Sequence, residues 1–374
     1  MSGIYIHIPF CRKACHYCNF HFSTQVEHID DFVESLLLEI KLQKEYLTSP
    51  VETIYFGGGT PSLLSEHHLT KITTELYNQF IIAPEVEFTL EANPDDISES
   101  KTLLWKSVGI NRLSIGIQSF QNEALAWMNR AHNTQQSILA IETSKAAGIH
   151  NINADLIYGT PHLSDEALLK DIAILNQYKI PHISCYALTV EEKTALHHLI
   201  LENKIDNVDT EKQARHFDLV VAELNSNGYE HYEISNFSLP GYRSKHNSNY
   251  WKGIPYLGLG PSAHSYNVHT RQWNVSNNHF YMQSIQEGKI PFELEKLDTA
   301  TSFNEYMMIS LRLLEGVDMS EVAARFGEAY IAHTQLVLTP LLAEGKLVNT
   351  QKGFTIAKNA RFLADGIASN FFIV

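Results

Sequence analysis

Residues 5–18 of the chain read YIHIPFCRKACHYC, a short apolar run followed by three closely spaced cysteines. Cys11, Cys15 and Cys18 have the spacing C-x3-C-x2-C, and the only other cysteine of the 374 residues is Cys185. Four cysteines are too few for a disulfide framework, so we expect a reducing, cytoplasmic setting. Three thiols within eight residues in such a setting indicate metal or redox chemistry. Cys185, isolated in an apolar run, is expected to be a buried free thiol.

The cysteine spacing leaves two kinds of metal site open. A structural zinc ion takes four ligands, so His7, His16 or His21 would have to complete the set. A [4Fe–4S] cluster normally takes four cysteines. With three cysteines, one iron keeps an open position for an exogenous ligand, which is a catalytic arrangement rather than a structural one.

Outward from this segment, the first 235 residues alternate between short runs rich in β-branched and aromatic residues and longer helical patterns. The predicted strands are Gly3–Ile8, Val51–Phe56, Val86–Ala92, Arg112–Gln118, Asn151–Tyr158 and Pro181–Leu188. Ile29–Leu47 has one apolar face, and a second helix is predicted after Ser65, a candidate N-cap. A third such helix ends near Gly228. Repeated strand–helix units predict an α/β fold, a partial (β/α)6 barrel of the TIM type, whose chemistry lies at the carboxyl ends of the strands.

Two further regions follow the predicted barrel domain of residues 1–235. Residues 236–284 are rich in Gly, Asn, Tyr, Trp and His and show little periodicity, so we expect a mostly irregular segment. Residues 285–374 are predicted to form a small C-terminal domain with helices at Ser302–Leu314, Met319–Phe326 and His333–Glu344. A hairpin at Lys346–Ile356 turning at Lys352-Gly353 makes this domain winged-helix-like.

Composition excludes several partners. The net charge of −14 is unsuited to a nucleic-acid-binding protein, which usually presents a basic surface. No run of 18 apolar residues occurs, so no membrane span is expected. The first residues show neither a basic region nor a long apolar core, so no secretory signal is expected.

The order of motifs in residues 1–235 resembles the radical S-adenosylmethionine (SAM) superfamily. Gly57-Gly58-Gly59-Thr60-Pro61 follows the second predicted strand, and glycines there let the backbone approach a ligand closely. The resemblance implies a [4Fe–4S] cluster on the three cysteines, with SAM completing it. The residues that it assigns to SAM are Tyr5, Gly58, Gly59, Thr60, Glu91, Gln118, Arg130, Asp155 and Ala187. The chemistry agrees, because carboxylates accept from an amine or ribose hydroxyls and an Arg can pair with a carboxylate.

Within this superfamily the whole chain resembles the group around oxygen-independent coproporphyrinogen III dehydrogenase. That group also contains the HemW-type heme chaperones. Three features favour the chaperones. Phe20 stands where the dehydrogenases have a fourth Cys, and only ten residues precede Cys11, whereas the dehydrogenases have a long N-terminal arm there. Residues 246–251 match the chaperone motif H-N-x-x-Y-W. The resemblance implies heme binding by His246, Tyr250 and Trp251, with His246 on the heme iron. An imidazole is a common heme ligand, and aromatic faces suit a porphyrin.

Two functions therefore remain open. The first is a heme chaperone that delivers heme to acceptor hemoproteins, including membrane-bound respiratory ones, and that forms a homodimer or reaches the membrane through protein partners. The second is the dehydrogenase, a radical SAM enzyme. Asn247 and His264 are further candidate heme contacts, and whether SAM is cleaved is left open by the sequence.

Overall fold

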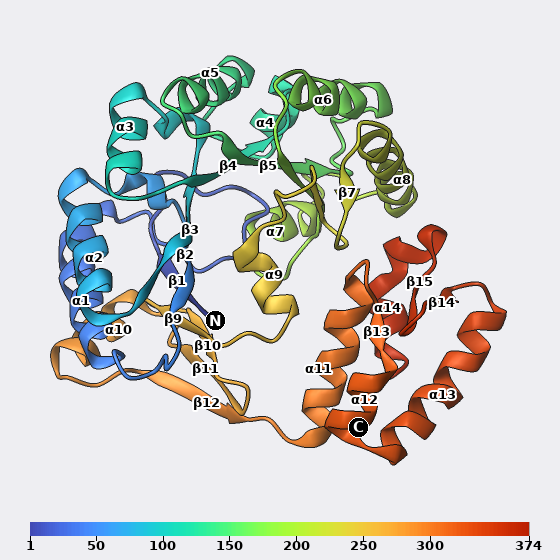
Figure 1. The fold of residues 1–374 in the computed structure, drawn as a ribbon. Helices are drawn as coiled ribbons and strands as arrows, with labels where there is room; N and C mark the ends of the chain where they lie inside the picture. The colour runs from blue at the N-terminus through green and yellow to red at the C-terminus, as the bar shows by residue number, and fades with distance from the viewer. Residues whose placement is uncertain (374) are drawn as a thin grey trace.

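The computed structural model describes residues 1–373, and six parallel strands form its centre (Figure 1). These strands are β1 Ser2–Ile8, β2 Val51–Gly58, β3 Ile82–Ala92, β4 Arg112–Gln118, β5 Asn151–Tyr158 and β6 His182–Ala187. They are hydrogen-bonded in chain order. All six predicted strands are confirmed, with ends shifted by at most four residues. The curved sheet stays open, as in a partial (β/α)6 barrel.

Helices cover the outside of this sheet, as the strand–helix alternation predicts (Figure 1). They are α1 Ile29–Leu42, α2 Glu66–Gln79, α3 Glu99–Ser107, α5 Thr134–Ala146, α6 Asp165–Gln177 and α8 Thr210–Ser226. Two short helices, α4 Asn122–Trp127 and α7 Ala195–Leu201, instead share an apolar cluster beside the cysteine loop, where His16 exchanges backbone hydrogen bonds with Met128 and Leu196. Ser65 caps α2 as predicted, because its hydroxyl accepts from the His68 N–H at 3.2 Å. Helix α1 ends earlier than Leu47, yet its apolar face (Phe32, Leu36 and Ile40) is fully buried against the sheet.

Residues 236–284 are more regular than the sequence predicts. Beyond β1 the sheet continues through β9 Tyr256–Leu259, β10 His264–Tyr266, β11 Thr270–Asn274 and β12 Phe292–Lys296. Beyond β6 lie β8 Asn236–Ser238 and β7 Glu230–His231. Strands of two to five residues are too short for an alternating pattern to be read from sequence, which is why this segment was expected to be irregular. The H-N-x-x-Y-W match of residues 246–251, called the heme motif below after the role that the resemblance implies, lies in a helix, α9 Lys245–Trp251.

The sheet extension is tied to the barrel by one buried carboxylate. Glu39 of α1 has no solvent exposure and accepts from the Gly260 N–H at 2.7 Å, from Asn274 Nδ2 at 2.6 Å and from the Tyr281 hydroxyl at 2.6 Å. These donors follow β9, end β11 and lie on α10 Asn278–Gln286, respectively. A buried carboxylate is stable only when its oxygens are hydrogen-bonded, so this network fixes the extension in place.

The C-terminal domain packs around its own apolar core. Its elements are α11 Thr299–Arg312, β13 Val317–Asp318, α12 Met319–Phe326, α13 Glu328–Ala343, β14 Leu347–Asn349, β15 Gly353–Ile356 and α14 Ala364–Ser369. The three strands form a small antiparallel sheet, and the predicted helices and hairpin are present. Since α10 spans residue 285 and β12 still pairs with the large sheet, this domain begins near Thr299 rather than at 285. Short 3-10 turns lie at Val26–His28, Pro61–Leu63, Pro94–Asp96 and Lys358–Leu363.

Candidate functional site

A cavity of about 680 Å³ opens at the carboxyl ends of the six parallel strands. Almost every residue that the sequence analysis assigned to the cluster or to SAM lines it: Cys11, Cys15, Cys18, Gly58, Gly59, Thr60, Glu91, Gln118, Arg130, Asp155 and Ala187. The exception is Tyr5, which lines a different cavity described below. The position agrees with the rule that barrel chemistry lies at this end of the strands.

The three cysteines of the loop after β1 are free and face this cavity. The Thr60 hydroxyl donates to Cys11 Sγ at 3.3 Å, and Arg130 Nη1 donates to Cys15 Sγ at 3.4 Å. Burial raises the pKa of Cys11 to about 11, so without a metal this thiol stays protonated. Among residues 1–373 no three His, Cys, Asp or Glu side chains converge on the position of a single ion. A cubane cluster does not require this, because each thiolate binds a different iron.

The glycine loop after β2 lets the backbone approach the cysteine loop. A Cβ on Gly59 would lie 2.6 Å from the Phe10 carbonyl oxygen and 2.8 Å from that of Ile8, both backbone atoms that cannot yield easily. Gly58 has a φ of +104°, which residues with a side chain rarely adopt. The two loops therefore form one surface, and this fits a cofactor held between the cysteines and the glycine loop.

Two carboxylates, Glu91 of β3 and Asp155 of β5, face the same cavity. Glu91 Oε1 accepts from the Tyr55 hydroxyl at 2.8 Å, and Asp155 accepts from Asn153 Nδ2 at 2.8 Å. The pKa of Glu91 is raised to about 7, mainly by burial and also by the nearby Asp155, while the Tyr55 hydrogen bond opposes the shift. Burial also raises the pKa of Asp155. A cationic or hydroxyl-rich ligand would stabilise both carboxylates in their charged form, as the amine and ribose of SAM would.

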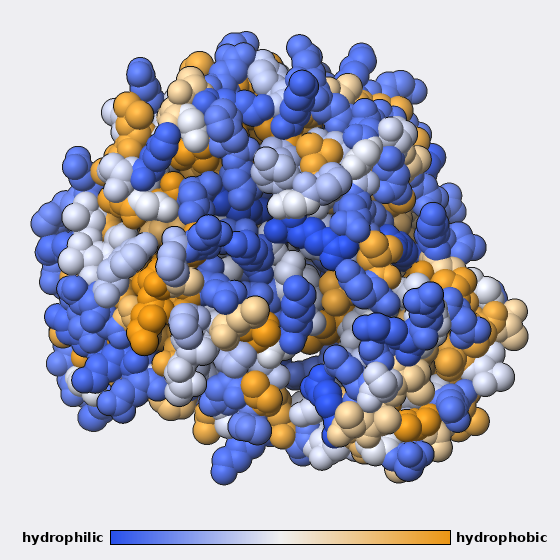
Figure 2. Space-filling model, in the orientation of Figure 1, coloured by the Kyte–Doolittle hydropathy of each residue, from blue (hydrophilic) through white to orange (hydrophobic). Residues whose placement is uncertain are grey.

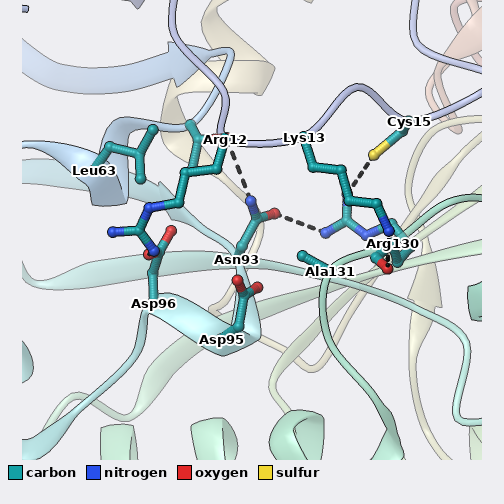
Figure 3. Close-up of a pocket in the computed structure, with 10 residues that line it drawn as sticks. Arg12, Lys13, Cys15, Leu63, Asn93, Asp95, Asp96, Arg130 and Ala131 are labelled. Carbon is teal, nitrogen blue, oxygen red and sulfur yellow. Dashed lines mark hydrogen bonds and ion pairs between the residues drawn. The ribbon is translucent and has the colours of Figure 1, made fainter. Parts of the chain in front are cut away.

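Arg130 connects the cysteines to the ends of β3 and β4. Its Nη2 donates to Asn93 Oδ1 at 2.7 Å, while its Nη1 reaches Cys15 (Figure 3). Nη2 also donates to the Gly116 carbonyl oxygen at 2.8 Å. Asn93 also donates to the Thr60 hydroxyl at 3.3 Å, which links Arg130 to the glycine loop. Asn93 was not among the predicted residues. Its place directly after Glu91-Ala92 is the signal that could have found it.

Arg112, at the start of β4, was also missed by the sequence analysis. Its side chain is 1% exposed, and within residues 1–373 its Nε and Nη2 have no hydrogen-bond partner, yet the residue lines the cavity. A buried guanidinium with unsatisfied N–H groups is costly unless a ligand or water meets them. The cavity is therefore polar at its floor as well as at its rim, and this suits a polar cofactor such as SAM. With the three thiols it fits a cluster-bound SAM, which would supply one-electron chemistry.

Helix α9, which carries the heme motif, lies against the inner side of β1 and β2. His246 is 2% exposed, with Nδ1 at 2.8 Å from Thr53 Oγ1 and Nε2 at 2.9 Å from the Tyr250 hydroxyl. Its ring stacks on that of Tyr55 with centroids 5.0 Å apart. Burial lowers the pKa of His246 to about 3, so the ring is neutral. With both ring nitrogens engaged, the structure does not present His246 as an open iron ligand.

A second cavity, of about 740 Å³, lies between the sheet extension, α9 and the C-terminal domain; we call it the crevice. Its lining residues are Tyr5, His7, Asn19, Phe20, His21, Tyr250, Trp251, Gly253, Tyr256, Ser262, His264, Tyr266, Arg271, Glu305, Met308 and Ile309. Figure 2 shows a hollow between the barrel and the C-terminal domain, beside the position of α11 in Figure 1. Asn19 and Phe20 line both cavities, so the loop after Cys18 is a wall that the two share.

The structure also bears on two further expectations from the sequence, the burial of Cys185 and the membrane span. Cys185 is 3% exposed in β6, the buried position expected of a lone thiol. Within residues 1–373, none of the helices has the length and apolar character needed to span a bilayer.

Two family models match separate parts of the chain. The family model described as the Radical SAM superfamily matches residues 5–175, and that of the HemN C-terminal domain matches residues 297–363. The superfamily match implies a [4Fe–4S] cluster and SAM.

Full-length relatives are found among curated proteins. The chain is 32% identical over 377 residues to the heme chaperone HemW of Bacillus subtilis, covering 99% of each chain. It is 33% identical over 376 residues to the heme chaperone HemW of Lactococcus lactis, covering 98% of each. Among solved structures, coproporphyrinogen III oxidase (HemN) of Escherichia coli matches with a TM-score of 0.86 and 21% identity, covering 99% of this chain and 89% of that one. At that identity the match shows the shared fold alone.

Proposed function

The chain belongs to the HemW family of heme chaperones, and from that premise we propose that it binds heme and transfers it to acceptor hemoproteins on a radical SAM scaffold. The family is shown by relatives more than 30% identical over nearly the whole length. The dehydrogenase alternative is not favoured, because the match to HemN extends only to the fold.

The observation that carries the proposal is the crevice. A chaperone on this scaffold needs a place for its cargo apart from the 680 Å³ cavity that the cysteines and the predicted SAM residues line, which we call the SAM cavity. The crevice has a volume of about 740 Å³, within the ~300–1,000 Å³ of small-molecule sites. Its lining combines aromatic rings with histidines, the chemistry that a porphyrin and its iron require.

The heme motif bears on this proposal in two ways. Tyr250 and Trp251 line the crevice directly, which supports them as heme contacts. His246 stands behind Tyr250 and holds its hydroxyl, so ligation of iron by His246 would require breaking its hydrogen bonds to Tyr250 and Thr53. Asn247 lines the SAM cavity instead.

The test uses the full chain with its cluster reconstituted under anaerobic conditions. Heme is titrated and followed by its Soret band, and the loaded protein is then mixed with an apo-hemoprotein. We expect saturation near one heme per chain and transfer to the acceptor. Weak, non-saturable binding would overturn the proposal, and SAM-dependent CO2 release from coproporphyrinogen III would favour the dehydrogenase.

The finer parts of the proposal concern partners. Delivery to membrane-bound respiratory hemoproteins, contact with the membrane through such proteins, and homodimerisation are included in it. Size-exclusion chromatography with light scattering tests the dimer. Co-sedimentation with vesicles that contain or lack a respiratory hemoprotein tests the membrane contact.

A further inference from the structure

We propose that heme binds in the crevice with His264, not His246, as the axial ligand of its iron; this inference rests on the proposed function. Several segments of the chain line the crevice. They are the sheet extension, helix α9, helix α11 of the C-terminal domain, the loop after Cys18 and the end of β1.

The strand register places His264 on the crevice side of the extension. In β10 His264 and Tyr266 are two residues apart and both line the crevice, while Ser265 between them is buried on the other face and bonded to the Gly258 backbone at 2.8 Å. In the antiparallel pair β10–β11, Tyr266 lies opposite Arg271, which also lines the crevice. Since residues directly opposite share a face, the register and the lining agree.

Three histidines line the crevice, and they differ in what their rings already contact. His7 is 4% exposed, with one ring nitrogen at 3.2 Å from the Tyr5 hydroxyl and the other at 2.8 Å from the His21 carbonyl oxygen. His21 Nε2 lies 2.7 Å from Asn278 Oδ1. His264 is exposed, and no hydrogen bond to its ring occurs among residues 1–373. Its ring stacks on that of Trp273, with centroids 5.9 Å apart, which holds the imidazole in place.

The apolar side chains of the crevice match a flat ring. Phe20 is 65% exposed at the end of the cysteine loop and lines the crevice, so its ring is available to a ligand there. Met308 and Ile309 of α11 and Tyr250 and Trp251 of α9 also line the crevice. Burying these side chains against a porphyrin removes apolar surface from water on both partners.

The charges of the crevice set the direction in which heme enters. Arg271 is the one crevice cation of the described residues apart from the histidines, and its guanidinium is paired with Glu305 and lies 4.0 Å from Glu295. A single, already paired Arg cannot neutralise two propionates. The propionates are therefore expected at the open side, where water solvates them, with at most one of them reaching Arg271.

An exposed single ligand suits transfer. A buried pair of imidazoles would hold heme tightly, whereas one solvent-accessible imidazole can be displaced by a ligand of the acceptor. His264 has the accessibility that such an exchange requires.

The experiment compares His264→Ala, His246→Ala and the matched control His269→Ala in the full, cluster-reconstituted chain. His269 is exposed in the same hairpin and does not line the crevice. For His264→Ala we expect loss of the imidazole-type Soret and electron paramagnetic resonance signatures and an affinity lower by roughly tenfold or more. Imidazole added to the solution should restore the signature. His269→Ala should match the wild type, and melting temperatures should confirm that all variants are folded.

The outcomes separate the inference from the proposed function. A wild-type chain that does not saturate with heme refutes the proposed function itself. A wild type that saturates, together with His264→Ala of unchanged spectrum and affinity, overturns the assignment of the ligand alone. Loss of the imidazole signature in His246→Ala but not in His264→Ala would return the ligand to His246.

Discussion

Replacing Glu39 tests whether one buried carboxylate holds the crevice wall to the barrel. The change Glu39→Ala leaves the Gly260 N–H, the Asn274 amide and the Tyr281 hydroxyl without their acceptor. Each unsatisfied buried donor costs about 1–3 kcal/mol, and Tyr281 can redirect its hydroxyl, so we expect a loss of roughly 3–5 kcal/mol of unfolding free energy. The change Glu39→Gln keeps one acceptor oxygen but turns an N–H2 towards a donor. Its expected loss is about 1–3 kcal/mol.

The assay is urea denaturation combined with hydrogen–deuterium exchange. Exchange should speed up in β9–β12 and α10 and stay slow in β2–β5, because only the extension depends on Glu39. Glu45→Gln, at an exposed position just after α1, serves as the control. A Glu39→Gln chain as stable as the wild type would mean that Glu39 is protonated in the fold, and the reasoning from an ionised acceptor would be refuted.

Three other predictions concern the SAM cavity and α9. With a Glu91 pKa of about 7, the ionised fraction of this carboxyl rises roughly tenfold from pH 6 to pH 8. Calorimetry should therefore show that SAM affinity rises more steeply over this range in the wild type than in Glu91→Gln. Parallel pH profiles of the two chains would contradict this. Gly59→Ala places a Cβ 2.6 Å from the Phe10 carbonyl oxygen and should lower the iron content after reconstitution, whereas Gly366→Ala, with no atom within 4 Å, should not. Since burial lowers the pKa of His246 from 6.5 to about 3, unfolding takes up a proton below pH 6.5. Wild-type stability should therefore fall relative to His246→Phe as the pH drops below 6.5, by about 1.4 kcal/mol per pH unit between pH 5.5 and pH 4, as measured by urea denaturation at several pH values. A constant difference between the two chains would show that the ring is not buried in its neutral form.

The sequence predicted the barrel well because its strands are long and buried on both faces. Each of the six leaves a run of apolar residues bounded by Gly, Pro or Asn, and helical periodicity separates them. The cluster and SAM residues followed, because the carboxyl ends of parallel strands meet at one edge. All of them except Tyr5 line one cavity.

What escaped prediction depends on contacts between distant segments. Nothing in the sequence near His246 indicates that its ring bonds to Thr53, which lies 193 residues away. Arg112 reads as an ordinary polar residue at the start of a strand, and only the assembled barrel shows its N–H groups facing a cavity. The strands β9–β12 are too short to be distinguished from loop, so the crevice that they form with α11 could not be foreseen.

The position of helix α9 affects how substitutions in the heme motif can be interpreted. Asn247 contacts the SAM cavity, Tyr250 and Trp251 border the crevice, and His246 supports β2 between them. Different positions of this one short helix thus serve different features, namely the two cavities and a barrel strand. Loss of heme binding alone in a variant of the motif therefore does not identify a ligand, and only a loss of the imidazole signature in a folded chain that still binds heme does so. Residues on the hairpin opposite, which touch the crevice alone, offer separable mutations.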